Sequence, residues 1–239
     1  MTSGPFLHTT PDEVLSETTE QLVAIPFKGK TPRQFRLMLP VSIDVLLDHP
    51  TTYAAFDQDE YMPYWAELWP SALMLGEAIA QRAWSTEMQV LEVGCGLGLP
   101  GLVALALGME VVFSDYDVAA LGFAARNARL NGFEQFRTLP LDWRCPPNDL
   151  KVPLILAADV IYEARNIAPL IQLMATVLTP GGECWLSDPD RPHKQEFQQS
   201  LRDQGFEFEA LPRSLERLGQ PTVQGTVYRI MSPWLRISG

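Results

Sequence analysis

The sequence predicts an α/β fold with a Rossmann-like, seven-stranded, mostly parallel sheet covered by helices on both faces. From residue 88 onward, apolar strand-like runs alternate with helical segments, and this order produces parallel strands joined by crossover helices. The last two strand-like runs follow each other without a helix, which predicts an antiparallel final strand. The 239 residues and 46% hydrophobic content suffice for one large domain with a small extension.

The N-terminal part of the chain is expected to form a β-hairpin. "EQLVAIPF" (20–27) and "RQFRLMLP" (33–40) are rich in strand-forming residues. Between them, Gly29 and Pro32 favour a turn.

A short connection joins this hairpin to the main part of the chain. "SIDVLLD" (42–48) and a polar loop follow the hairpin. We therefore expect an N-terminal extension over residues 1–55 and a main domain over residues 56–239. The first helix of the main domain is expected to begin at Pro70 and Ser71, because proline fits the first helical position.

Each further element follows from an apolar run and from the residues that end it. Asn131-Gly132 and Pro180-Gly181 are expected to end two of the helices. The expected strands are 88–95, 110–115, 136–143, 153–162, 183–189, 206–212 and 224–232. The expected helices are 99–108, 118–132, 166–182 and 194–205.

Composition and charge limit the classes of partner. The formal charge of −11 disfavours binding to a phosphate backbone, so we expect no nucleic-acid partner. Cys95, Cys145 and Cys184 are too few and too widely spaced for a disulfide framework or a zinc site, and His8, His49 and His193 form no metal-binding set. The few, scattered cysteines favour a reduced, cytoplasmic compartment. No apolar run approaches ~18 residues and the N-terminus is acidic, so we expect no association with membranes. We also expect a monomer.

A glycine-rich turn follows the first strand of the alternating pattern. Gly94, Gly96 and Gly98 allow a ligand to approach the backbone closely, and ligands of such sheets bind at the carboxyl ends of the strands. Three interpretations compete. The series Gly96, Gly98 and Gly101 matches the dinucleotide fingerprint, Glu92 before three alternating glycines suits S-adenosyl-L-methionine (SAM), and the turn could also be purely structural.

The charge of Glu92 favours SAM over a dinucleotide. SAM carries a cationic sulfonium and an α-ammonium group, so a nearby carboxylate helps to bind it, whereas the same carboxylate would lie near phosphate in a dinucleotide site. Glu92 could contact the cofactor or could brace the turn by accepting backbone N–H groups. We therefore expect SAM as the cofactor.

Two acids follow the second strand of the alternating pattern. An acid at this point accepts hydrogen bonds from ribose hydroxyls in either nucleotide interpretation. We assign that role to Asp115, because Asp117 is better placed to cap the following helix.

The motifs "EVGCGLG", "SDYD", "LDW" and "AADVIY" occur in the order found in class I, seven-β-strand SAM methyltransferases, and the chain resembles that group. "PYWAELWPSA" and Asp159-Val-Ile-Tyr162 make it similar to the family-16 protein-lysine methyltransferases. Within that family it most resembles the electron-transfer-flavoprotein β-subunit lysine methyltransferases, on the strength of "PYWAELWP", "SDPDRP" and "PTVQGTVYRI". Met62 stands where that subgroup tends to have aspartate. The resemblance covers residues 60–230, and so identifies 56–239 as a SAM-dependent methyltransferase domain.

The resemblance implies a set of cofactor-binding residues. Trp69 would lie along the cofactor, and Asp115 would hold the ribose. Asp142 would be available to the adenine amino group. The full set that we expect to form the cofactor site is Trp69, Glu92, Gly94, Cys95, Gly96, Asp115, Asp142, Trp143 and Ala158.

The resemblance also implies catalytic residues, Asp159 and Tyr162, that would face an incoming amine. Asp159 could bind a lysine ammonium, and Tyr162 could orient the amine or could simply close the core. Trp65 could form a wall of the substrate channel or could simply be a packing residue. The charged loop 188–191 could line the entrance for the substrate or could form a solvated salt bridge. We therefore expect a protein-lysine N-methyltransferase. A small-molecule methyltransferase and a non-catalytic SAM-binding module are the alternatives.

Overall fold

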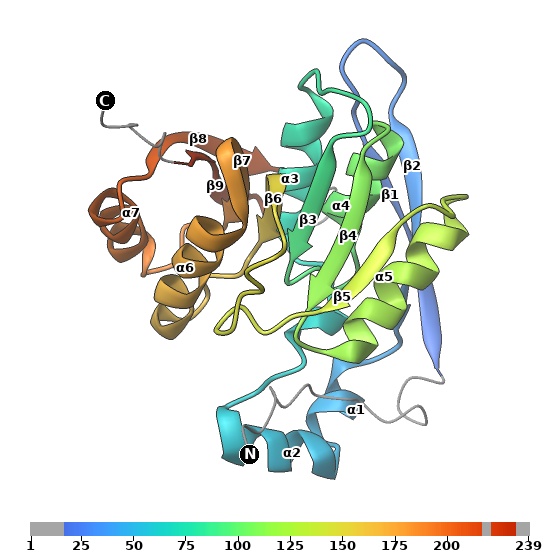
Figure 1. Ribbon diagram of the computed structural model, residues 1–239. Helices are drawn as coiled ribbons and strands as arrows, with labels where there is room; N and C mark the ends of the chain where they lie inside the picture. Colours follow the sequence, from blue (N-terminus) through green and yellow to red (C-terminus); the bar gives the residue numbers. More distant parts are fainter. Residues whose placement is uncertain (1–16, 217–220, 233–239) are drawn as a thin grey trace, which may run out of the picture.

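The computed structural model describes residues 17–216 and 221–232 and shows a seven-stranded sheet with the order β5-β4-β3-β6-β7-β9-β8 (Figure 1). Strands β3 to β7 are mutually parallel, and β9 runs antiparallel to both of its neighbours, β7 and β8. The predicted fold and its antiparallel final strand are confirmed. The strands are β3 (Gln89–Val93), β4 (Glu110–Asp115), β5 (Arg137–Pro140), β6 (Val152–Ala158), β7 (Leu178–Asp188), β8 (Glu207–Leu215) and β9 (Val223–Met231).

Helices cover both faces of the sheet (Figure 1). One layer comprises α3 (Pro70–Ala80), α4 (Leu99–Ala106) and α5 (Val118–Leu130). The opposite layer comprises α6 (Ile167–Val177) and α7 (Lys194–Asp203). This is the arrangement that alternating strands and helices predict.

Alternate residues of each central strand enter different cores. Val90 of β3 packs in the core beneath α3 to α5, whereas Leu91 and Val93 pack in the core beneath α6 and α7. Because side chains alternate along a strand, Glu92 lies on the same face as Val90. That face carries α4, so the carboxylate of Glu92 is aimed at the helix that follows the glycine turn.

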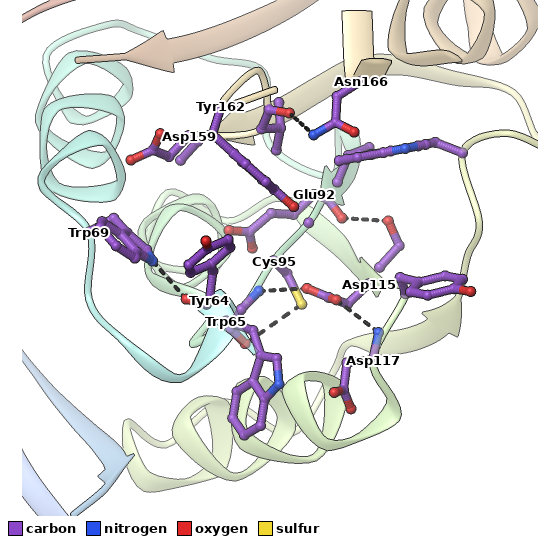
Figure 2. Close-up of a pocket in the computed structure, with 18 of the residues that line it drawn as sticks. Tyr64, Trp65, Trp69, Glu92, Cys95, Asp115, Asp117, Asp159, Tyr162 and Asn166 are labelled. Carbon is purple, nitrogen blue, oxygen red and sulfur yellow. Dashed lines mark hydrogen bonds between the residues drawn. The ribbon is translucent and has the colours of Figure 1, made fainter. Parts of the chain in front are cut away.

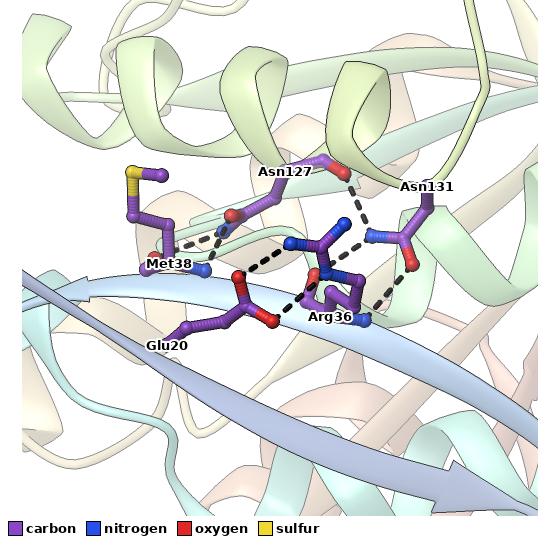
Figure 3. Close-up of polar contacts among 5 residues, drawn as sticks. All are labelled: Glu20, Arg36, Met38, Asn127 and Asn131. Atoms are coloured by element: carbon purple, nitrogen blue, oxygen red, sulfur yellow. Dashed lines mark hydrogen bonds and ion pairs between the residues drawn. The ribbon is translucent and has the colours of Figure 1, made fainter.

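The predicted N-terminal hairpin is present as β1 (Thr18–Ile25) and β2 (Arg33–Pro40), which pair antiparallel. Its inward side chains belong to the same apolar cluster as α3, α4 and α5. Asn127 of α5 and Asn131, which caps the carboxyl end of that helix, fix the position of the hairpin (Figure 3). Asn127 accepts from the N–H of Met38 at 2.7 Å and donates to its carbonyl at 3.2 Å. Asn131 accepts from the N–H of Arg36 at 2.9 Å and donates to its carbonyl at 2.7 Å.

The segment between the hairpin and the main domain is more helical than expected. Ser42 caps a short helix, α1 (Ile43–Leu47), by accepting from the N–H of Asp44. The expected polar loop is instead a second helix, α2 (Pro50–Asp59). Its sequence lacks a one-sided apolar stripe, so periodicity gave no signal. Figure 1 shows both helices beyond the carboxyl ends of the parallel strands.

Several predicted boundaries in the second half of the chain are wrong, and two of the differences have a clear physical cause. The helix expected over 166–182 ends at Val177, because Thr179 precedes a proline and Leu178 already pairs with Val152 of β6. The strand expected over 153–162 ends at Ala158, because the backbone of Asp159 is left-handed, with a φ of +57°. The chain therefore turns away from the sheet where the predicted catalytic residues begin.

Some sequence expectations lie beyond these observations. Residues 1–16 of the expected N-terminal extension are outside the described residues, and the division at residue 55 stays a prediction. Within residues 17–216 and 221–232, no helix is long and apolar enough to span a bilayer. The same residues contain no cluster of three or more acidic, histidine or cysteine side chains able to hold a metal ion.

Candidate active site

A cavity of about 300 Å³ lies at the carboxyl ends of β3, β4 and β6. A pocket of this size is at the lower end of the range for small-molecule and cofactor sites. Its walls are the glycine turn after β3, the loops after β4, β5 and β6, and the segment around the 3-10 helix η1 (Tyr64–Ala66). All the predicted site residues line it, and Figure 2 shows ten of its lining residues labelled.

The glycine turn is shaped by backbone conformations that other residues rarely adopt. Gly94, Gly96 and Gly98 have φ values of +60°, +49° and +80°. A Cβ atom on Gly94 would lie 3.0 Å from Val160, and one on Gly96 would lie 3.2 Å from the carbonyl oxygen of Trp65. The turn therefore needs glycine both for its conformation and for the close approach of its surroundings.

Glu92 braces this turn from beneath. Its side chain is 2% exposed, and its Oε2 accepts from the N–H of Gly101 at 3.0 Å. Burial raises the pKa of Glu92 well above its ordinary value. Glu92 therefore ties β3 to the first turn of α4, directly after the glycine turn, and a direct contact between Glu92 and the cofactor stays a prediction.

Asp115 holds the turn from the side. Its Oδ2 accepts from the N–H of Gly96 at 2.9 Å, and its Oδ1 accepts from the N–H of Asp117 at 3.0 Å. Burial raises the pKa of Asp115 to about 6. Asp117 caps α5 by accepting from the N–H of Ala119 at 2.7 Å, as expected, and it also accepts from the hydroxyl of Tyr61.

The "LDW" motif places an aromatic ring beside the glycine turn. The Trp143 ring lies 3.7 Å from the position of a Cβ on Gly94. Asp142 is buried, and its Oδ1 accepts from the N–H and the Nε of Arg144, both at 2.9 Å. Arg144 in turn lies 5.2 Å over the Tyr116 ring. The carboxylate expected to meet the adenine amino group is therefore already engaged by a guanidinium.

Aromatic side chains form the other wall of the cavity. Tyr64 stands edge-on to both Trp69 and Tyr162, with ring centroids 6.1 and 5.4 Å apart. The indole N–H of Trp69 donates to the carbonyl of Tyr64 at 2.7 Å. Trp65 is buried against Phe123, 5.4 Å between centroids, so it packs as the more ordinary interpretation expected. Figure 2 shows the Tyr162 ring extending into the cavity.

Asp159 is strained, buried and only half paired. Its Oδ1 accepts from the Nε of Arg191 at 2.7 Å, while its Oδ2 is buried and has no hydrogen-bond partner among the described residues. A left-handed conformation costs a non-glycine residue free energy and persists at functional sites. The charged loop 188–191 contacts this carboxylate through Arg191. Within the loop, Asp188 Oδ1 accepts from the N–H of Arg191 at 2.8 Å. Arg191, which is partly exposed, therefore links the buried residues Asp159 and Asp188.

The remaining predicted residues contribute mainly backbone. Ala158 ends β6 at the cavity wall. The amide N–H of Cys95 donates to the carbonyl of Ser114 at 2.9 Å, and burial raises the pKa of its thiol well above the ordinary value. A thiol with a raised pKa is a poor nucleophile.

Several residues of the site were not predicted from the sequence. Tyr61 and Tyr64 lie in the aromatic segment that carries Trp65, and only their spacing in "EYMPYW" hinted at a role. Arg165 of the 3-10 helix η2 (Ala164–Asn166) reaches across the pocket to Glu60, with 2.6 Å between Nη1 and Oε2. No local pattern indicates a partner 105 residues away.

Comparison with known proteins places this geometry in a family. The sequence model described as "Lysine methyltransferase" matches residues 55–203, more than half of the chain. The chain belongs to this lysine methyltransferase family. The predicted family is thereby confirmed, and the fold with its glycine turn is that of the class I SAM methyltransferases.

Individual relatives act on different side chains. A histidine protein methyltransferase 1 homolog of Dictyostelium discoideum is 31% identical over 105 residues, 41% of this chain and 34% of the relative. The histone-arginine methyltransferase METTL23 of Xenopus laevis is 28% identical over 131 residues, covering 51% and 56%. The matches thus span between a third and just over half of the length of these relatives.

A solved structure supports the cofactor assignment through the fold. The N-methyltransferase NodS of Bradyrhizobium japonicum WM9, in complex with S-adenosyl-L-homocysteine (SAH), matches with a TM-score of 0.52 and 16% identity. The match covers 81% of this chain and 92% of NodS. The cofactor of this family fold is SAM. The cradle around Gly94 and Gly96, where a Cβ would lie 3.0 and 3.2 Å from its nearest neighbours, fits such a group.

Proposed function

We propose that this protein transfers a methyl group from SAM to the side-chain amine of a lysine in a protein substrate. The observation that carries the proposal is the state of Asp159. It lies at the carboxyl end of β6, lines the cavity together with the glycine turn, and has one carboxylate oxygen without a hydrogen-bond partner among the described residues.

The single available oxygen favours an ammonium over a guanidinium. An arginine side chain binds a carboxylate best through two parallel hydrogen bonds. In Asp159 one oxygen is already held by Arg191 at 2.7 Å, so a second guanidinium could form two parallel hydrogen bonds only in competition with Arg191. A lysine ammonium is a compact charge that needs only one such contact. The aromatic rings of Tyr64, Trp69 and Tyr162 suit its apolar stem.

The chain's residues can then carry out the steps that precede transfer. SAM, when bound, supplies a methyl group on a sulfonium that needs no further activation for displacement. Asp159 would hold the amine in line, and the aromatic wall would exclude water. An unperturbed lysine amine has a pKa of about 10.4 and must lose its proton before it attacks. Burial raises the pKa of Tyr162 to about 12, so its hydroxyl stays protonated and can donate a hydrogen bond.

The test is label transfer from methyl-labelled SAM into a demethylated cell lysate, followed by mass spectrometry of the modified residue. The sharpest variant is Asp159→Asn. Asparagine tolerates a φ of +57°, keeps the shape of the side chain and removes its charge. We expect transfer to fall by about 10²-fold or more, while SAH still binds with micromolar affinity in calorimetry.

Each alternative predicts a different result. Label in the small-molecule fraction would favour a metabolite amine as the acceptor, and label on arginine or histidine would contradict the argument from the single oxygen. Tight SAH binding without transfer to any fraction would favour a binding module. Full activity of Asp159→Asn would show that the carboxylate has no part in transfer.

A further inference from the structure

The contact between Arg191 and Asp159 has a consequence for the chemistry of the site. We propose that Arg191 is a positioning residue that weakens the negative potential of Asp159 at the acceptor position, so that the bound amine loses its proton to water more readily than beside an uncompensated carboxylate. This inference rests on the proposed function and deepens it, because it assigns to one residue the control of the amine's protonation.

Arg191 is held in place by both its backbone and its side chain. Its N–H donates to Asp188 Oδ1 at 2.8 Å, and its Nε donates to Asp159 Oδ1 at 2.7 Å. The N–H of Asp159 donates to the carbonyl of Ser187 at 2.8 Å. The end of β6 and the loop after β7 are thus tied together around one guanidinium.

The loop that carries Arg191 is itself fixed. Asp190 has a φ of +57°, and its Oδ1 accepts from Lys194 Nζ at 2.8 Å and from the hydroxyl of Thr226 at 2.7 Å. The side chain of Arg191 is 31% exposed and that of Asp159 only 5%. The guanidinium therefore compensates a buried charge from the solvent side, without filling the cavity.

Several charged groups lie near Asp159 and Arg191, the part of the site that we call the acceptor corner. Asp159 and Asp188 are both buried and both contact Arg191, and Asp188 Oδ2 is also without a hydrogen-bond partner in the described part of the chain. Burial raises the pKa of Asp188 to about 6, so it is largely ionised at neutral pH. The titratable and charged groups that face this corner are Tyr64, Asp159, Tyr162, Glu163, Asp188, Asp190, Arg191 and Lys194.

Removing Arg191 would leave the buried carboxylate of Asp159, which lines the cavity, without its guanidinium partner, and would also take away a positive charge close to Asp188. An opposite charge within a few ångströms favours the charged form of an amine. The ammonium would then bind more tightly and release its proton at higher pH. With Arg191 present, Asp159 can still align the amine by a hydrogen bond but holds its proton less strongly.

The experiment uses sinefungin, a SAM analogue with a primary amine in place of the methylated sulfur, and SAH, which has no such amine. The ratio of the two affinities reports the potential at the transfer position and needs no protein substrate. We expect Arg191→Met to raise the affinity for sinefungin relative to SAH by about tenfold at neutral pH, which corresponds to one pKa unit. Arg191→Lys, which keeps the charge, should stay near the wild-type ratio.

The control is Arg202→Met, which removes a guanidinium of α7 that lies 5.0 Å over the Phe208 ring, away from the cavity. It should leave the ratio unchanged. Arg191→Gln is the second neutral variant if Arg191→Met loses its fold in thermal melting. An unchanged ratio in a neutral variant that binds SAH normally would overturn the inference.

Transfer kinetics give a second readout on the protein that becomes labelled. We expect the rising limb of kcat against pH, which reports the bound amine, to move up by about one unit in Arg191→Met, with a lower KM and a recovery of kcat in alkali. An equal loss of kcat at every pH would indicate a purely structural role. Absence of labelled lysine would refute the proposed function but leave the sinefungin ratio as a separate result.

Discussion

Replacing Gly101 with alanine is a direct test of how the cofactor turn is built. A Cβ at this position would lie 2.4 Å from Glu92 Oε2 and 2.4 Å from Cε1 of Phe113. Both partners are buried, at 2% and 0% exposure, so neither can move into solvent. The methyl group would have to displace the carboxylate that accepts from the N–H of Gly101 itself.

The expected magnitude follows from three terms. Replacing glycine with alanine within a helix stabilises the folded protein by up to about 1 kcal/mol. Overpacking a close-packed core costs about 1–3 kcal/mol, and loss of the Glu92 hydrogen bond costs about 1–3 kcal/mol more. We therefore expect Gly101→Ala to lower the free energy of unfolding by about 1–5 kcal/mol, which is a large part of the stability of a typical domain.

The matched control is Gly122→Ala in α5. This glycine is also helical, but it is exposed and a Cβ there would have nothing within 4 Å. The same chemical change should stabilise the protein by up to about 1 kcal/mol. Urea unfolding of the two variants, with SAH calorimetry on each, measures the contrast. A Gly101→Ala protein as stable as Gly122→Ala would refute the account of Glu92 as a brace.

Two further predictions concern the hairpin and the pH dependence of stability. Asn127→Ala should cost about 2–4 kcal/mol in urea unfolding, because this fully buried side chain bonds Met38 and the carbonyl of Leu97. Asn131→Ala, at the half-buried carboxyl end of α5, should lower the free energy of unfolding by less. Equal losses in the two variants would contradict the idea that the buried Asn127 contributes more than Asn131 to holding the hairpin. The pKa of Asp188 is about 6 in the folded protein and ~3.9 when unfolded. Folding therefore favours its protonated form, and stability falls as pH rises from about 4 to about 6. Asp188→Asn should show a smaller fall of Tm across that window, and an unchanged slope would contradict the assignment.

The fold could be predicted because its signals are local. Apolar runs with strand or helical period, ended by residues such as Gly108 and Asn131-Gly132, fixed the order of the elements from residue 88 onward. Where the signal was weak, the prediction failed. In α2 (Pro50–Asp59) no stripe of apolar residues marks the helix, and at Leu178 the pairing with Val152 outweighs the helical pattern that continues to Pro180.

The sequence could predict residues that line the cavity, but not how their side chains pair. Motif and resemblance brought Glu92, Asp115, Asp142 and Asp159 to one cavity. None of these acids is free of the protein, however. Glu92 and Asp115 each accept from a backbone N–H, 9 and 19 residues away along the chain. Asp142 pairs with Arg144, two residues away, and Asp159 pairs with Arg191, 32 residues away. Such contacts depend on the side-chain directions at strand ends, which a linear pattern does not contain.

The different states of these acids suggest how the work of the site is divided. Glu92 and Asp115 accept hydrogen bonds from the N–H groups of Gly101 and Gly96. These bonds hold the turn in its shape before the cofactor binds. A preformed turn loses little conformational entropy on binding. Asp159 differs, because it keeps a buried oxygen without a partner and a left-handed backbone. Both features cost stability, and a chain retains them where an arriving group supplies the missing contact. That contrast is why we assign the first two acids to the architecture of the cofactor site and Asp159 to the acceptor.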